Sequence, residues 1–141
     1  MTQTSHGATL RRAVETCIRP DEAGIAGLGE LFTDDVVVWT PNLLTTGRAE
    51  LADALTFREN AFTDVEIQFD GVDVFAGKGF VEFRVSANFS GPFVIDEEVT
   101  IEPNGRRLVL GAAAVVEFES GKIRALRAYF DDSALLEQMI A

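Results

Sequence analysis

Apolar residues recur with helical spacing through the first third of the chain. The clearest stripe has members three or four positions apart: Leu10, Ala13, Val14, Cys17 and Ile18. It ends at Pro20, which predicts an amphipathic helix over about residues 5–19. Similar spacing predicts a shorter helix over residues 21–32 and a third helix after a loop at residues 42–47. Between these helices, the β-branched and aromatic run at residues 36–40 is typical of a short strand.

The spacing changes from helical to alternating at Thr63. Within residues 80–89, for example, apolar and polar side chains alternate, which places them on opposite faces of a strand. This alternation predicts consecutive antiparallel strands at residues 63–74, 80–89, 93–102, 106–118 and 122–130. The Asn104-Gly105 pair is a strong signal for a hairpin between the third and fourth of them. Asp131 and Asp132 then offer N-caps for a short last helix.

This order of elements predicts an α+β fold. Three N-terminal helices pack on a strongly curved antiparallel or mixed sheet, and a short C-terminal helix follows the sheet. The length of 141 residues, with 47% hydrophobic and 25% charged residues, is typical of one globular domain. We expect residues 8–141 to form this domain and residues 1–7 to be a mobile N-terminus. A sheet curved around helices tends to enclose a pocket.

The charge and the scarcity of metal-binding residues narrow the possible partners. Asp and Glu number 23 against 12 Lys and Arg, giving a net charge of -11, so neither nucleic acid nor a membrane is a predicted partner. Cys17 and His6 are the only residues of their types, so we predict no disulfide, no metal and no cofactor. The chain starts without a secretory signal and contains no apolar run of about 18 residues, from which we expect a cytoplasmic protein.

Several short strings occur in a fixed order along the chain: Leu31-Phe32-Thr33-Asp34-Asp35-Val36, Gly47-Arg48, Gly91-Pro92-Phe93, Gly105-Arg106-Arg107, Gly121-Lys122-Ile123 and Tyr129-Phe130-Asp131. In this order, over about residues 8–141, the chain resembles the SnoaL-like branch of the nuclear transport factor 2-like superfamily. That superfamily includes ketosteroid isomerases, polyketide cyclases and scytalone dehydratases. The resemblance implies a cone-shaped fold whose apolar interior holds a substrate, but the fold hosts many functions and selects none of them.

The resemblance also implies where acid and base groups would lie, and these positions carry none here. Ketosteroid isomerases have an aspartate base just before the proline that closes the first strand, where this chain has Thr40. Their oxyanion-hole tyrosine and protonated aspartic acid correspond to positions near Thr16 and Ala114. The acid and the histidine of SnoaL-like cyclases correspond to Leu126 and to residues 111–114. These side chains do not exchange protons near neutral pH, so the catalytic residues are unknown.

Alternation counted back from Phe130 predicts the walls of the cone. Together with Thr16 on the first helix, the residues expected to line it and to contact a ligand are Val38, Thr40, Leu55, Phe83, Val85, Ala87, Ala114, Val116, Leu126 and Phe130. This assignment depends on the strand register, because a shift of one residue would turn Arg127 and Tyr129 inward.

The opposite face of the central strands is predicted to be mixed polar, with Glu82, Arg84, Ser86, Asn88, Glu117, Arg127 and Tyr129. The resemblance implies that two copies pack these faces together, and opposite charges can pair across a two-fold axis. We therefore predict a homodimer whose contact includes or borders Arg84, Arg127 and Tyr129.

Three functions remain open at this point. The protein binds a small, mostly apolar molecule, or it is an isomerase, cyclase or dehydratase in which Thr40, Asn42 or a water does the work of carboxylates. Alternatively, it is a dimeric interaction domain whose own side chains fill the cone. A cavity of about 300 Å³ or more separates the first two functions from the third. An ionisable side chain in that cavity favours an enzyme over a binding protein.

Overall fold

The computed structural model describes residues 3–58 and 61–141, and these confirm the predicted α+β class. The helices are α1 (Gln3–Ile18), α2 (Glu22–Ala26), α3 (Leu28–Leu31), α4 (Arg48–Arg58) and α5 (Asp132–Ile140). The strands are β1 (Phe32–Thr40), β2 (Leu43–Thr46), β3 (Phe62–Phe75), β4 (Lys78–Phe89), β5 (Phe93–Val94), β6 (Thr100–Ile101), β7 (Arg107–Glu119) and β8 (Lys122–Phe130). None of the helices in this part of the chain is long and apolar enough to cross a membrane.

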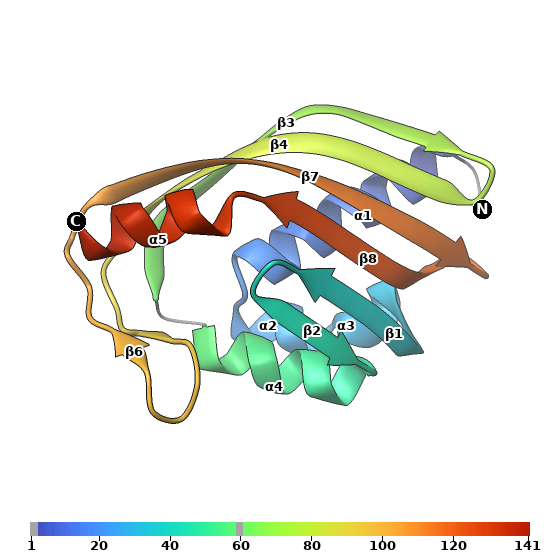
Figure 1. Cartoon of the computed structure of the whole chain (residues 1–141). Helices are drawn as coiled ribbons and strands as arrows, with labels where there is room; N and C mark the ends of the chain where they lie inside the picture. The colour runs from blue at the N-terminus through green and yellow to red at the C-terminus, as the bar shows by residue number, and fades with distance from the viewer. Residues whose placement is uncertain (1–2, 59–60) are drawn as a thin grey trace.

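One large curved sheet organises the molecule. Its strand order is β2-β1-β8-β7-β4-β3, and β5 and β6 form a separate small sheet. Neighbouring strands of the large sheet are antiparallel except β1 and β8, which are parallel, so the sheet is mixed. In Figure 1 the long strands β3, β4 and β7 curve over α1, while α4 lies beneath β1 and β2. The helices therefore cover one face of the sheet, as predicted.

Close packing of α1 on the sheet requires a glycine in β4. Leu10, Ala13 and Val14 of the predicted stripe are buried. A Cβ at Gly79 would lie 2.9 Å from Leu10 Cδ2 and 3.0 Å from Val116 Cγ2, so a larger residue would push the helix away from the strand. The apolar stripe thus meets a strand position that leaves room for it.

The first helix starts earlier than predicted. It begins at Gln3, so residues 3–7, which were expected to belong to a separate mobile terminus, form its first turns. Residues 1 and 2 of that expected terminus lie outside the described residues. The ring of His6 stacks on Phe118 of β7 with centroids 4.2 Å apart, which ties this turn to the sheet.

Three further predictions about the first half of the chain were wrong. The helix expected over residues 21–32 is divided at Gly27 into α2 and α3, and β1 starts at Phe32 rather than at residue 36. The expected loop at residues 42–47 contains β2, which pairs with β1 from Val37 to Thr40. The strand residues Leu43-Leu44-Thr45-Thr46 include two threonines, which favour strands, while Asn42 and Gly47 flank them as turn residues.

The predicted hairpin at Asn104-Gly105 does not form. Strand β7 pairs with β4 and β8, whereas the preceding β6 pairs with β5. Gly105 does adopt a positive φ of 72°, but the Asn104 side chain donates hydrogen bonds to the backbone carbonyls of Gln138 and Met139 at 3.0 and 2.9 Å. The Asn104 side chain therefore caps the last turn of α5, and the Gly105 N–H donates to the Phe89 carbonyl oxygen at 2.9 Å.

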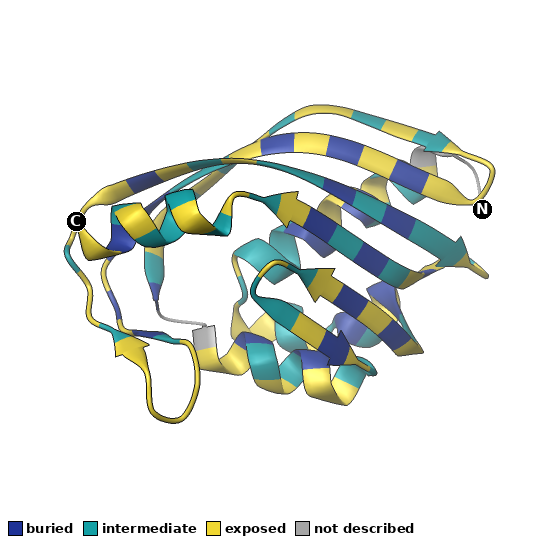
Figure 2. Cartoon of the chain, viewed as in Figure 1, coloured by how far each residue is buried: buried dark blue, intermediate teal, exposed yellow. Residues whose placement is uncertain are grey.

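The strand phase predicted from Phe130 is confirmed. Leu126 and Ala128 of β8 are buried, while the Arg127 side chain between them lies on the outer face and bonds Glu117 at 2.8 Å. Figure 2 shows the same alternation of buried and exposed residues along β4, β7 and β8. Buried apolar residues form a main cluster beneath α1 and α4 and a smaller one around Phe89, Phe93 and Met139.

Candidate ligand-binding cavity

A cavity of about 170 Å³ lies between the inner face of the sheet and helices α1 and α4. It is partly open to solvent and borders both apolar clusters. Helices α1 and α4 supply Val14, Cys17, Ile18, Ala54 and Leu55, and the strands supply most of the remaining wall.

Most of the predicted cone residues line this cavity: Val38, Thr40, Leu55, Phe83, Val85, Ala87, Ala114, Leu126 and Phe130. Thr16 and Val116 do not. Thr16 lies one helical position from Cys17 and faces α2, where its Cγ2 is 3.3 Å from the Cβ position of Gly24. Val116 points inward but packs beneath α1 beside Gly79, beyond the end of the cavity. That the lining residues contact a ligand stays a prediction.

The lining also contains residues that the sequence analysis did not assign to it. They come from strand ends as well as from helices and connections, and include Pro20, Asn42, Leu43, Phe62, Phe93, Leu108 and Leu135. Alternation within strands places side chains on a face, but it does not show which loop covers the open end of a sheet. No sequence signal identified Phe93 or Leu135 as neighbours of this space.

Three polar side chains form a hydrogen-bonded chain at one end of the cavity. The Thr40 hydroxyl donates to Asn42 Oδ1 at 3.0 Å, and the Asn42 backbone N–H donates to Thr40 Oγ1 at 3.3 Å. Asn42 Nδ2 donates to Asp132 Oδ1 at 3.0 Å. Thr40 and Asn42 belong to the lining, and Asp132 reaches it only through Asn42. The predicted capping of α5 falls to Asp131, which accepts from the Ala134 N–H, whereas Asp132 holds Asn42.

Cys17 is the third polar lining residue, and its thiol stays protonated. Burial raises the pKa of Cys17 from the usual 9.0 to about 12, because a thiolate would lose its hydration in these apolar surroundings. A protonated thiol is a poor nucleophile near neutral pH. The side chain therefore acts as a small apolar part of the wall, as predicted for this stripe position.

Charged side chains are absent from the cavity wall formed by the described residues. The wall consists of apolar side chains together with Thr40, Asn42 and Cys17, none of which is ionised at neutral pH. Over residues 3–58 and 61–141, no three His, Cys, Asp or Glu side chains gather closely enough to hold a metal ion. The arrangement provides apolar contact and hydrogen bonds, without a group that takes a proton near neutral pH.

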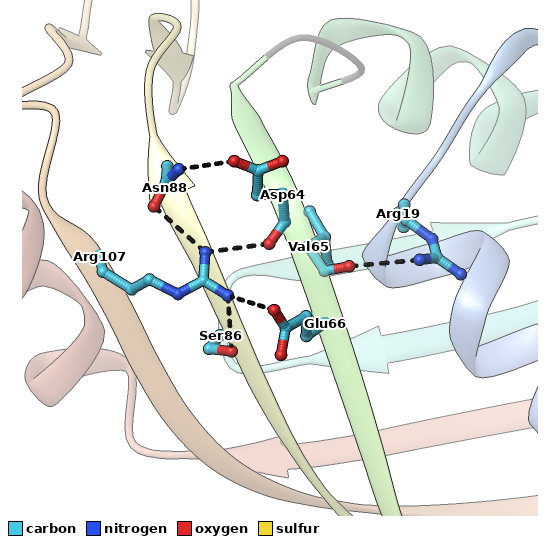
Figure 3. A network of polar contacts seen from close by, with 7 residues as sticks. All are labelled: Arg19, Asp64, Val65, Glu66, Ser86, Asn88 and Arg107. Carbon is cyan, nitrogen blue, oxygen red and sulfur yellow. Dashed lines mark hydrogen bonds and ion pairs between the residues drawn. The ribbon is translucent and has the colours of Figure 1, made fainter.

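Polar contacts from both sides hold the start of β3, which forms one edge of the wall (Figure 3). Val65 lines the cavity, and Arg19 at the end of α1 donates to its carbonyl oxygen at 3.2 Å. Arg107 of β7 donates to the carbonyl oxygen of the preceding residue, Asp64, at 3.0 Å. Two arginines from different elements thus hold adjacent peptide groups at the start of β3.

The fold and this cavity place the chain among the cone-shaped α+β proteins, and its family follows from comparison with known sequences. The chain belongs to the SnoaL-like family, because the model of the SnoaL-like domain matches residues 10–126. This confirms the resemblance found in the sequence. No curated protein sequence is detectably similar to the chain.

Solved structures of low sequence identity share the whole fold. A proposed SnoaL-like polyketide cyclase from Jannaschia sp. CCS1 has a TM-score of 0.83 at 16% identity, covering 99% of this chain and 94% of its own. An LEH-like epoxide hydrolase from M. tuberculosis has a TM-score of 0.70 at 13% identity, with coverage of 98% and 91%. A protein of ketosteroid isomerase-like fold from Catenulispora acidiphila, solved with trimethylamine, has a TM-score of 0.71 at 13% identity, with coverage of 93% and 91%. At these identities the likeness shows the fold alone.

Proposed function

We propose that the protein binds a small, neutral, mostly apolar molecule in the cavity beneath the sheet. The observation that carries this proposal is the composition of the wall, which is apolar except for Thr40, Asn42 and the protonated Cys17. A charged ligand would lose its hydration there without meeting an opposite charge, whereas an apolar ligand gains from leaving water. Apolar walls with a few placed polar groups are the usual form of small-molecule sites.

The volume limits the size of this molecule. About 170 Å³ is less than the roughly 300 Å³ that we expected to separate a ligand-binding cone from a filled one. It is nevertheless close to the roughly 150 Å³ of an apolar cavity that holds benzene. The space therefore favours a ligand whose buried part is about the size of one six-membered ring.

The same wall disfavours an enzyme that abstracts protons from its substrate. Proton abstraction next to a carbonyl needs a positioned base, which typically contributes about 10² to 10⁴-fold to the rate. Thr40 occupies the position expected for such a base, and its hydroxyl is committed to Asn42. We therefore expect no isomerisation of ketosteroids at an enzymatic rate, and binding rather than catalysis is the proposed role.

Toluene binding tests this function, with two neighbouring alanines as a matched pair. Ala112 lines the cavity, whereas Ala113 is on the outer face opposite Tyr129. Ala112→Leu adds three carbons to the cavity, so it should abolish toluene binding in isothermal titration calorimetry. Ala113→Leu should leave toluene binding unchanged. Absence of toluene binding by the natural chain up to the solubility limit would contradict the proposal.

We also propose that two copies pack through the outer face of the sheet. The helices cover only the inner face, and the outer face exposes several large apolar side chains, among them Trp39, Phe80, Val109 and Tyr129. The rings of Trp39 and Tyr129 lie 5.3 Å apart. Around them are charged residues of both signs, including Arg127 with Glu117 and Arg84 with Asp70. A self-complementary face with an apolar centre and charges of both signs suits a two-fold interface.

Sedimentation at micromolar concentration tests this dimer. Tyr129→Asp places a charge at the proposed interface and should shift the chain to monomers. Phe57→Asp makes the same kind of change at an exposed position of α4, away from the outer face of the sheet, and should leave the dimer intact. Reversing both Arg84 and Arg127 to Glu should also dissociate it. A chain that is monomeric at these concentrations, or a dimer that survives Tyr129→Asp, would show that this face is not an interface.

A further inference from the structure

We infer that the ligand donates a hydrogen bond, from a hydroxyl or an N–H group, to Thr40 Oγ1 at the polar end of the cavity. The inference rests on the proposed function and specifies the chemistry of the same site. It follows from the direction of the hydrogen bonds between Thr40, Asn42 and Asp132 rather than from the shape of the cavity. Asp132 acts here as a positioning residue, since it reaches the cavity only through Asn42.

The direction of this chain is set at Asp132. A carboxylate oxygen accepts hydrogen bonds and does not donate them. Asp132 Oδ1 lies 3.0 Å from the Asn42 side chain, which must therefore turn its NH₂ group toward the carboxylate. The other end of the same planar amide, Asn42 Oδ1, then faces Thr40. An amide that could otherwise be placed either way round is held in one orientation.

This orientation decides what Thr40 offers to the cavity. A hydroxyl has one hydrogen and two lone pairs. The hydrogen of Thr40 is donated to Asn42 Oδ1 at 3.0 Å, and one lone pair receives the Asn42 backbone N–H at 3.3 Å. The second lone pair is what Thr40 retains for a ligand. A ligand group that only accepts hydrogen bonds finds no hydrogen on this hydroxyl.

The chemical class of the ligand follows from size and polarity together. The volume of about 170 Å³ favours one ring or a chain of similar bulk. A donor group at one end of that molecule satisfies Thr40, whereas an ether or ketone in the same place leaves two acceptors facing each other. Small phenols, cyclic alcohols and ring N–H compounds fit this description, and aryl ethers and ketones of the same size do not.

Three probes of similar size separate the polar preference from apolar binding. Phenol carries a donor, anisole carries an acceptor alone, and toluene carries neither. We compare the phenol-to-anisole affinity ratio between the natural chain and variants, because this comparison cancels the different hydration of the probes. Thr40→Val removes the lone pair and should lower the ratio about fivefold, the value of one ordinary hydrogen bond. Thr40→Ser keeps the hydroxyl and should keep the ratio.

The Asp132→Asn variant tests the positioning role of Asp132 separately. An asparagine at position 132 can accept or donate, so in Asp132→Asn this position no longer fixes the orientation of the Asn42 amide, and Thr40 can present its hydrogen to a ligand. The phenol-to-anisole ratio should therefore fall, while toluene affinity stays within about twofold. A merely structural role of Asp132 would instead lower the affinity of all three probes together.

The outcomes distinguish this inference from the proposed function. Toluene binding with a ratio that Thr40→Val leaves unchanged overturns the inference and preserves the proposed function. A ratio that rises in Thr40→Val shows that Thr40 donates to the ligand, which also overturns the inference. If the natural chain binds none of the three probes, the proposed function fails, and the inference fails with it.

Discussion

Arg107 Nη1 donates a hydrogen bond to the backbone carbonyl oxygen of Asp64, 3.0 Å away, although β4 lies between the strands that carry the two residues. The same guanidinium contacts Asn88 Oδ1 and Ser86 Oγ on β4 at 3.1 Å and Glu66 on β3 at 3.3 Å (Figure 3). Asp64 has a positive φ of 50°, and the β3–β4 register shifts between Thr63 and Glu66. Arg107 thus holds a strained, bulged start of β3 against the sheet.

Removing this guanidinium should destabilise the fold. Arg107→Met keeps the apolar part of the side chain but loses its hydrogen bonds, which should lower the free energy of unfolding by about 1 to 2 kcal/mol, since the group is partly exposed. Urea denaturation measures the change. Arg106→Met, at the exposed neighbouring position, is the control and should have little effect. Equal stabilities for the two variants would contradict the proposed role of Arg107.

Replacing glycine with alanine should destabilise the fold more at position 79 than at position 111. A Cβ at position 79 would lie within 3.0 Å of two fully buried side chains, Leu10 and Val116. Gly79→Ala should therefore lower the free energy of unfolding by about 1 to 3 kcal/mol through overpacking. Gly111 on β7 has no heavy atom within 4 Å of its Cβ position, so Gly111→Ala should be neutral or slightly stabilising. A Gly79→Ala variant as stable as Gly111→Ala would show that α1 adjusts without cost.

Removing the buried hydroxyl of Thr45 in β2 should stabilise the fold. Thr45 is 4% exposed, and its Oγ1 has no hydrogen-bond partner among the described residues. Thr45→Val replaces the hydroxyl by a methyl group of similar size, which should raise the free energy of unfolding by about 1 kcal/mol. Thr46→Val, at the exposed next position, controls for the change in side-chain type. A loss of stability in Thr45→Val would mean that this hydroxyl is hydrogen-bonded in solution.

The sequence predicted the parts of the structure that depend on periodicity. Alternation anchored on Phe130 placed Ala114 and Leu126 on the inner face, because a strand surrounded by other strands has only two faces to choose from. The prediction of a hairpin at Asn104-Gly105 was wrong because it relied on a local signal alone. A turn signal describes local backbone preference, and the contact of Asn104 with α5 joins residues far apart in the chain.

The candidate cavity was likewise predictable only where strand alternation determines it. Its strand walls follow from alternation, whereas the hydrogen bond from Asn42 to Asp132 connects residues 90 positions apart and leaves no mark in either segment. The position of Thr40 was identified, but its role depends on those two partners. The volume was not predictable, because it depends on how far α1 and α4 lie from the sheet.

The thiol of Cys17 should show an unusual pH dependence. Its pKa of about 12 means that the reactive thiolate is scarce near neutral pH, so alkylation by iodoacetamide at pH 8 should be about a thousandfold slower than in urea. Above pH 9 the unfolded thiol ionises while the folded thiol does not. The free energy of unfolding should therefore fall as the pH rises from about 9 to about 12. The Cys17→Ala variant should lack this fall in the free energy of unfolding. Identical pH profiles of unfolding for the natural chain and the variant would contradict the raised pKa of Cys17.

Protection of Cys17 by toluene is the most direct measurement of the central claim, because this residue is the chain's single cysteine and lines the cavity. The rate of alkylation at fixed pH should fall as toluene is added, following the occupancy measured by calorimetry. Protection should disappear in Ala112→Leu and persist in Ala113→Leu. An alkylation rate that toluene leaves unchanged in the natural chain, at concentrations up to its solubility, would show that the cavity beneath the sheet does not bind a small apolar molecule.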